Sequence, residues 1–277
     1  MRKLVGGSNN TGIELVIESG SGRSAIRKSL HPESVRSSVG DEVGMMRRLA
    51  GHGNIVRIYD FIPAPPQSSC HDQLYVEYCK SLVRGRETNT VFQLSKLYMQ
   101  EGKAAPEVFL WHLLEGLLKG IVYMQFGIQD VDEEPQPDWE TVFHNDLCAS
   151  NVFLSSKGPN AKPIMLRNEY PRIVIGDFGQ ANTAAGMNKY YSRAANAEFW
   201  MSLRPSGLDI QSIIGISELF TEAECAWVYS EELQKMLTGL QGLQDKSPDI
   251  ILLLRILVKT KSKLVKEGKL VFQPLLE

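Results

Sequence analysis

The sequence predicts an α+β protein in which a small β-rich part precedes a mainly helical part. Before residue 80, short apolar runs alternate with turn residues, and a single helical stretch covers residues 40–51. Five strands are expected, at residues 3–5, 13–18, 24–30, 54–62 and 73–79. We therefore expect a five-stranded antiparallel sheet with one helix over residues 1–79 and a helical part over residues 80–277.

Helical spacing of apolar residues is the main signal after residue 80. The longest stripe predicts a central helix that begins near Pro106 and contains Leu110, Leu113, Leu114, Leu117, Ile121 and Met124. Three further helices are expected at residues 208–220, 230–243 and 247–265, with Ser230 and Ser247 as N-caps of the last two. The acidic and proline-rich segments between these helices are expected to be surface loops.

Composition narrows the possible functions. Thirty basic and thirty-two acidic side chains leave a formal charge of -2, so no global field attracts nucleic acid or an anionic membrane. Neither the four cysteines, which lack CxxC spacing, nor the histidines indicate a metal site. The N-terminus lacks an apolar h-region and the run "IILLLRILV" is broken by Arg255, so we expect an intracellular, cytoplasmic protein that does not bind membranes.

Two stretches place polar groups where burial is expected. "FHNDLCASNVFL" carries Asp146 and Asn151 between apolar residues, and "RIVIGDFGQA" ends a strand just before Asp177. Buried polar groups require partners or a ligand. A hairpin with a long insertion would bring the two aspartates together, and two carboxylates with an amide form an oxygen ligand set suited to Mg²⁺.

These stretches resemble motifs of the protein kinase family. "HNDLCASN" is similar to the catalytic loop H-R-D-x-x-x-x-N, and "GDFG" is similar to the D-F-G motif that follows it. "SAIRKSL" resembles the third strand of the family, "HGNIVRIYDFI" the segment after helix C, and "LYVEYC" the hinge. The resemblance implies a bilobal kinase-like fold, with a sheet lobe at 1–79 and a helical lobe at 80–277.

The resemblance also implies roles for individual residues. Asp146 would accept the proton of the attacking hydroxyl, and Asn151 and Asp177 would hold Mg²⁺ on the phosphates of ATP. Lys28 would reach those phosphates and pair with Glu42, although strand alternation leaves open that Arg27 faces the site instead.

Further family positions would bind or support the nucleotide. Glu77 and Cys79 would offer backbone groups to adenine, with Val76 behind them. A glycine-rich loop would use Gly7, Asn9 and Gly12, with asparagine in place of the second glycine. His144 and Asp209 would support the catalytic loop without taking part in chemistry.

Three departures from the family leave several functions open. Asn145 replaces an arginine that binds a phosphorylated activation loop, Cys148 replaces a lysine of serine/threonine kinases, and no A-P-E motif follows Asp177. Because Asp146, Asn151 and Asp177 are retained, the resemblance still predicts an ATP-dependent protein kinase with a protein substrate. The alternatives are a pseudokinase that binds nucleotide or a partner protein, and a small-molecule kinase of the choline or aminoglycoside type, where "HND" also occurs.

Overall fold

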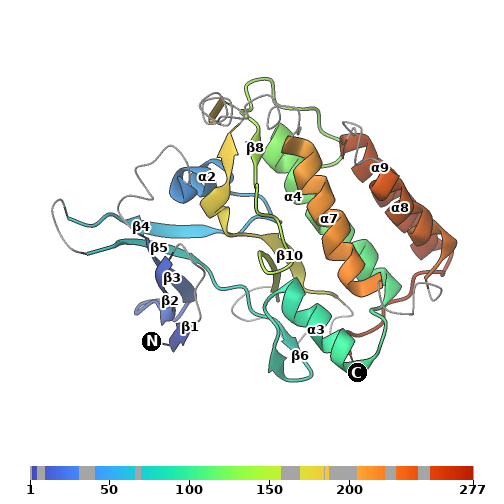
Figure 1. The fold of residues 1–277 in the computed structure, drawn as a ribbon, viewed down its shortest axis with the longest axis horizontal. Coiled ribbons are helices and arrows are strands. Elements are labelled where there is room, and N and C mark those ends of the chain that lie inside the picture. The colour runs from blue at the N-terminus through green and yellow to red at the C-terminus, as the bar shows by residue number, and fades with distance from the viewer. Residues whose placement is uncertain are drawn as a thin grey trace, which may run out of the picture.

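The computed structural model confirms an α+β protein with small antiparallel sheets (Figure 1). It describes residues 2–4, 10–30, 41–65, 70–156, 169–183, 185–186, 205–221, 229–242 and 250–276. The principal strands are β1 Arg2–Leu4, β2 Asn10–Ile17, β3 Ser24–Leu30, β4 Ile58–Ile62 and β5 Asp72–Glu77. These strands form one sheet in the order β1-β2-β3-β5-β4, with every pair antiparallel, as the sequence predicts.

The helix α2 (Glu42–Arg48) belongs to this β-rich part. Its N-cap is Asp41, whose side chain accepts a hydrogen bond from the Gly44 backbone N at 2.8 Å. In Figure 1 the sheet and α2 lie on one side of the molecule, and α4, α7, α8 and α9 lie on the other. The segment Leu74–Glu77 is strand rather than helix, which agrees with the predicted change of character near residue 80.

The helical part is built around α4 (Glu107–Phe126), which confirms the predicted central helix. Pro106 is its N-cap, and Gly127 ends it in the left-handed conformation at φ 72°. Around it lie α3 Val91–Glu101, α7 Pro205–Thr221, α8 Glu231–Gly242 and α9 Ile250–Lys266. The sequence analysis missed α3, while Ser247 lies outside the described residues.

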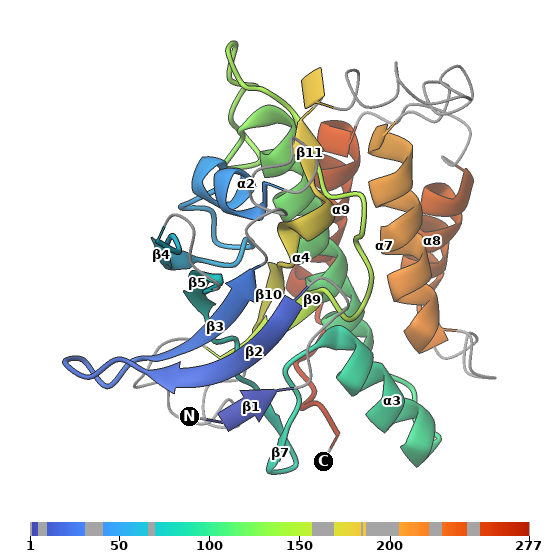
Figure 2. The ribbon, with the colours of Figure 1, turned by 60° about the vertical axis from the view of Figure 1, so that its left-hand side comes forward.

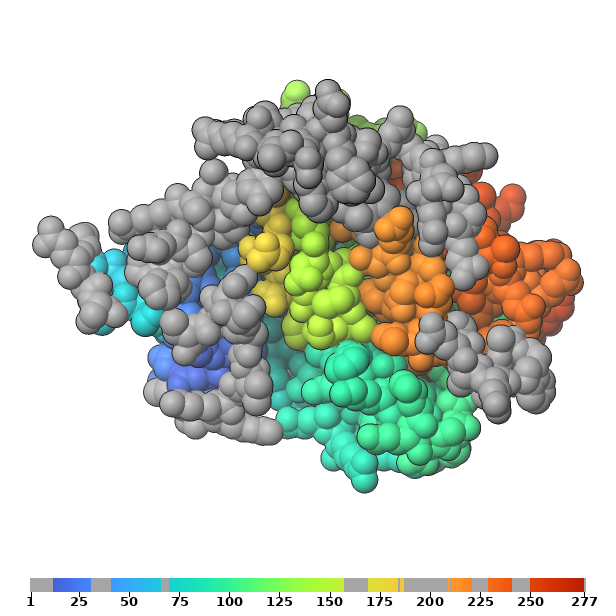
Figure 3. Space-filling view, in the orientation of Figure 1, coloured from blue at the N-terminus to red at the C-terminus, as the bar shows by residue number. Residues whose placement is uncertain are grey.

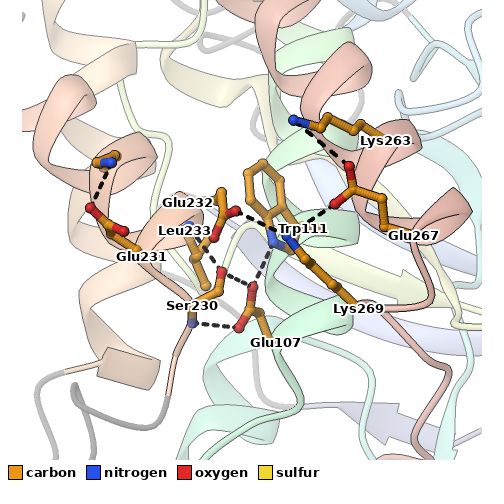
Figure 4. Close-up of polar contacts among 10 residues, drawn as sticks. Glu107, Trp111, Ser230, Glu231, Glu232, Leu233, Lys263, Glu267 and Lys269 are labelled. Carbon is orange, nitrogen blue, oxygen red and sulfur yellow. Dashed lines mark hydrogen bonds and ion pairs between the residues drawn. The ribbon is translucent and has the colours of Figure 1, made fainter.

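The side chain of Glu107 joins the start of α8 to α4 (Figure 4). The Glu107 carboxylate accepts hydrogen bonds from the Ser230 backbone N at 2.7 Å and from Trp111 Nε1 at 3.1 Å, and it also binds the Ser230 hydroxyl. Ser230 Oγ in turn accepts a hydrogen bond from Leu233 N at 3.2 Å, which confirms the predicted N-cap. A carboxylate from the first turn of α4 therefore holds the first turn of α8.

The described residues also form three two-stranded antiparallel sheets. The pairs are β6 Leu82–Val83 with β7 Arg86–Glu87, β8 Val142–Phe143 with β11 Asn182–Thr183, and β9 Val152–Ser155 with β10 Arg172–Ile175. The β9–β10 pair is the predicted hairpin with an insertion. In Figure 2 it lies between the five-stranded sheet and α4, and β10 contacts α4.

Buried apolar side chains run continuously through the described parts of the chain. The same cluster includes Met46 of α2, Leu74 of β5, Leu117 of α4, Ile175 of β10 and Leu257 of α9. The division of the chain into lobes at residues 79 and 80 stays a prediction. Within the described residues, none of the helices combines the length and apolar character needed to cross a membrane.

Gly116 lies at a close approach of α4 to β10. A Cβ at this position would lie 2.6 Å from Ile173 Cβ and 3.1 Å from Asn54 Nδ2, so only a glycine fits without movement. Gly116→Ala should therefore destabilise the fold by about 1–3 kcal/mol through overpacking, although alanine is the better helix former. Chemical unfolding of the parent and the variant measures this difference.

Gly239 in α8 provides the matched control. A Cβ there meets nothing within 4 Å, so Gly239→Ala should raise the free energy of unfolding by up to about 1 kcal/mol. Equal effects of the two substitutions would show that β10 does not pack against α4 in this way.

Candidate functional site

Lys28 lies at the centre of the candidate site. Its Nζ is 2.6 Å from Glu42 Oε1 and 2.9 Å from Asp177 Oδ1, so one ammonium group joins β3, α2 and the turn after β10. Arg27 faces the other side of the sheet, where it binds Glu14, its cross-strand partner on β2. Of these two side chains, Lys28 is therefore the one that lies beside Asp177.

Electrostatics favour the charged form of Lys28. Its side chain is buried, and this desolvation alone would lower the pKa of the ammonium group. The adjacent carboxylates of Glu42 and Asp177 outweigh the effect of burial, so the pKa of Lys28 is raised above its ordinary value. The site therefore holds a cation that stays protonated at neutral pH.

Asp177 occupies an unusual backbone conformation. It follows β10, has φ 64° and ψ 67°, and begins the short 3₁₀ turn Phe178–Gln180. A left-handed conformation is costly for a residue that is not glycine, and such strain is concentrated at functional sites. The turn buries Phe178 completely and contacts α2, while the Asp177 side chain stays 39% exposed.

Asp146 and Asn151 form the second half of the site. Asn151 Nδ2 donates hydrogen bonds to the Asp146 carbonyl at 2.8 Å and to Asp146 Oδ2 at 3.0 Å. The Asn151 carbonyl accepts a hydrogen bond from Gly176 N at 3.0 Å, which places Asn151 beside the residue that precedes Asp177. In Figure 3 a yellow-green patch and a yellow patch, the colours of the stretches that carry Asn151 and Asp177, lie side by side.

His144 joins the backbone of Asp146 to the backbone of Gly176. Its ring is fully buried; Nε2 lies 3.0 Å from the Gly176 carbonyl, and Nδ1 accepts a hydrogen bond from Asp146 N at 3.3 Å. This pattern requires a neutral ring protonated on Nε2. Burial lowers the pKa of His144, consistent with that neutral form.

Asp209, from α7, contacts the same loop. It is buried, and its Oδ2 accepts a hydrogen bond from His144 N at 3.3 Å. Desolvation raises the pKa of the Asp209 carboxyl to about 7, although the hydrogen bonds from the backbone of His144 and Asn145 oppose this change. Asp209 is therefore buried against the backbone of the loop at residues 144–151, in the supporting position that the resemblance implies.

Asn145 and Cys148, the two departures from the kinase motif in the loop at residues 144–151, both have hydrogen-bond partners. Asn145 has φ 61°, and its Nδ2 donates a hydrogen bond at 3.1 Å to the carbonyl of Gln180 in the turn after Asp177. Cys148 Sγ lies 3.0 Å from Ser150 Oγ. Asn145 therefore joins two segments of the site through a neutral amide.

The predicted adenine side is described only in part. Val76 is buried and, by register with Ile26, lies on the same face of the sheet as Lys28. Glu77 N donates a hydrogen bond to the Arg57 carbonyl at 2.8 Å, and burial raises the pKa of the Cys79 thiol to about 12. Gly12 lies at an irregularity of β2, whereas Gly7 and Asn9 lie outside the described residues.

Sequence reasoning missed three residues that hold the site together. Asn54 Nδ2 donates a hydrogen bond to the Ile173 carbonyl at 2.8 Å, Arg172 binds the Glu77 carboxylate, and Ser155 Oγ is 3.4 Å from the same carboxylate. A polar residue at the start of the apolar strand "RIVIG" is the signal that could have indicated Arg172. Arg172 and Ser155 belong to one end of the β9–β10 hairpin, and Asn54 binds the backbone of β10.

The residues present fit a hard cation such as Mg²⁺. The hydrogen bonds that the described residues make with the Asn151 side chain use Nδ2, which leaves the amide oxygen as the atom for a cation. Asp177 supplies a partly exposed carboxylate. No group of three or more histidine, cysteine or acidic residues suited to a metal occurs in the described part of the chain, so a metal here would also depend on oxygens from a ligand.

Comparison with known proteins gives no family assignment, because neither a protein-family model nor a curated protein matches this chain. The function must therefore be inferred from the residues of the site.

Ionisation of Asp209 should make stability depend on pH. The folded state holds this proton more tightly than the unfolded chain, where the pKa is near 3.8. The resulting stabilisation is complete below the unfolded pKa and is lost as the pH rises through about 7. Asp209→Asn keeps an oxygen acceptor but cannot ionise, so between pH 5 and 8 the parent should lose stability relative to the variant.

Urea unfolding at several pH values measures this difference. Asp132→Asn changes an exposed aspartate and should follow the parent at each pH. Parallel curves for the parent and Asp209→Asn would show that Asp209 does not ionise in this range.

Proposed function

We propose that the protein is an ATP-dependent phosphotransferase with a bilobal protein-kinase-like fold, which transfers the γ-phosphate to a hydroxyl of a protein substrate. The observation that carries this proposal is the contact of Lys28 Nζ with both Glu42 and Asp177, which are 14 and 149 residues away in the chain. The resemblance of the sequence to kinase motifs independently implies that these three residues belong to one site.

The charges of the site suit nucleotide phosphates. Lys28 offers a buried ammonium group that stays protonated at neutral pH and that Glu42 orients. Asp177 and the Asn151 amide oxygen would hold Mg²⁺, which when bound would neutralise charge on the phosphates. The remaining work of the residues is positioning, because phosphoryl transfer depends chiefly on alignment and charge stabilisation.

Asp146 is suited to accept a proton. Its carboxylate is exposed, while Asn151 holds Oδ2 and His144 holds the backbone N. A substrate hydroxyl bound there would give its proton to Asp146 as its oxygen bonds to the γ-phosphorus, while the bond to the ADP oxygen breaks. The carboxylate is thus fixed in direction yet open to a second molecule.

A second candidate function is nucleotide binding without turnover. Cys148 favours it, because this position lies two residues from Asp146 and supplies a thiol where serine/threonine kinases supply a lysine. Phosphoryl transfer would then lack one positive charge. Transfer to small hydroxyl compounds instead of proteins is the remaining alternative, and a comparison of acceptors separates it from protein phosphorylation.

Asp177→Ala should abolish metal-dependent nucleotide binding. Removing the carboxylate takes away a ligand of Mg²⁺ and leaves the Lys28 charge with one fewer partner. A thermal shift titration with ATP, with and without Mg²⁺, measures the effect. The exposed residue Asp138 gives the control, since Asp138→Ala should bind as the parent does; retained Mg-ATP binding by Asp177→Ala would contradict the metal assignment.

Asp146→Asn should reduce turnover by about 100-fold or more, the scale of a general base, while changing ATP affinity little. The reason is that the proton is accepted only during transfer. Labelled-ATP assays with the protein itself and with generic protein acceptors measure turnover, and Asp138→Asn is the control. Unchanged activity would place the base elsewhere, and nucleotide binding by a parent with no transfer would support the second candidate.

A further inference from the structure

An ion pair links the end of β5 to the start of β10. Arg172 Nη2 binds Glu77 Oε1, and both side chains are largely buried, at 18% and 12% exposure. Arg172 Nη1 also donates a hydrogen bond to the Gly53 carbonyl in the segment after α2. Because a guanidinium group is planar and holds several donors in fixed directions, Arg172 fixes both partners at once.

The Glu77 carboxylate is bound from several elements. In addition to Arg172 it contacts Ser155 Oγ of β9 at 3.4 Å and the backbone N of Arg57 at 3.4 Å. A buried charge is costly unless its hydrogen bonds are satisfied, and a pair satisfied in this way resists displacement. The end of β5 is therefore attached to the β9–β10 hairpin.

The hairpin carries the proposed metal residues at its opposite end. Arg172 pairs with Ser155 at one end, and Ile175 pairs with Val152 at the other. Asn151 immediately precedes Val152, and Asp177 follows two residues after Ile175. The two ends are three residue steps apart along the strand, which is about 10 Å. The hairpin therefore sets a fixed spacing between Glu77 and the metal residues.

We propose that Arg172 is a positioning residue for the nucleotide, because its ion pair with Glu77 fixes the adenine side of the site relative to the phosphate side. This inference rests on the proposed function, in which the Glu77 backbone meets adenine and Asp177 holds the metal. Arg172 itself touches neither adenine nor the metal and acts through Glu77 and β10.

Fragments of ATP distinguish positioning from direct binding. Adenosine needs only the adenine side, and magnesium tripolyphosphate needs only the phosphate side, so neither depends on the spacing. ATP must fit both sides at once, and it gains affinity from their correct separation. Loss of the ion pair should therefore weaken ATP much more than it weakens either fragment.

The experiment measures calorimetric dissociation constants for Mg-ATP, adenosine and magnesium tripolyphosphate. Arg172→Met should raise the constant for Mg-ATP about tenfold or more, the scale of a small misplacement, and change those of both fragments less than about twofold. Arg172→Lys, which keeps the charge without the planar fork, should lie between the parent and Arg172→Met.

Two further variants complete the design. Arg255→Met makes the same chemical change on α9, where Arg255 binds the Val131 carbonyl at 3.2 Å, and should leave all three constants unchanged. Glu77→Gln removes the other charge, and its effect on Mg-ATP should not add to that of Arg172→Met. If Arg172→Met fails to fold, Arg172→Lys and Glu77→Gln carry the same test.

The outcomes separate the inference from the function beneath it. A parent that binds Mg-ATP while the Arg172 and Glu77 variants bind it equally well overturns the positioning role and leaves the proposed function standing. An equal loss of affinity for Mg-ATP and for one fragment also overturns the positioning role. Such a result would indicate that Arg172 binds the ligand directly or that it only stabilises the fold. A parent that binds neither ATP nor its fragments overturns the proposed function and the inference together.

Discussion

Burial of the Lys28 ammonium group is the constraint on which the rest of the site depends. An unpaired charge in this position would carry a large desolvation cost, so β3 can occupy its place only if carboxylates are brought to it. One carboxylate comes from the first residue of α2 and the other from the turn after β10. The position of α2 and the strained backbone of Asp177 therefore both depend on pairing with the Lys28 ammonium group.

The strand β10 connects this charge to the remaining elements. Asn54 and Gly116 hold its middle, Arg172 attaches its start to β5, and the peptide of Gly176 is bound from both sides by Asn151 and His144. The backbone of the site is thus fixed by contacts from several elements that all meet one short hairpin. Such rigid support is what placement of a reacting group requires.

The sequence predicted the five-stranded sheet and the central helix because their apolar patterns are long and regular. It missed α3, although the capping box of Thr90 and Gln93 was present. The buried face of this helix is short, and the exposed apolar residues Phe92 and Met99 obscure its pattern. Alternation could not separate Lys28 from Arg27, since the answer depends on Glu14 of the neighbouring strand. Arg172 was missed for a similar reason: its partner is 95 residues away in the chain.

The amide of Asn145 has a consequence for how the turn after Asp177 is held. Its hydrogen bond to the Gln180 carbonyl joins two uncharged groups, and the β8–β11 pair beside it is also made of backbone hydrogen bonds. Neutral contacts of this kind are not screened by salt and need no modification to form. The attachment of this turn to the loop at residues 144–151 is therefore a property of the folded chain at any ionic strength in which it remains folded.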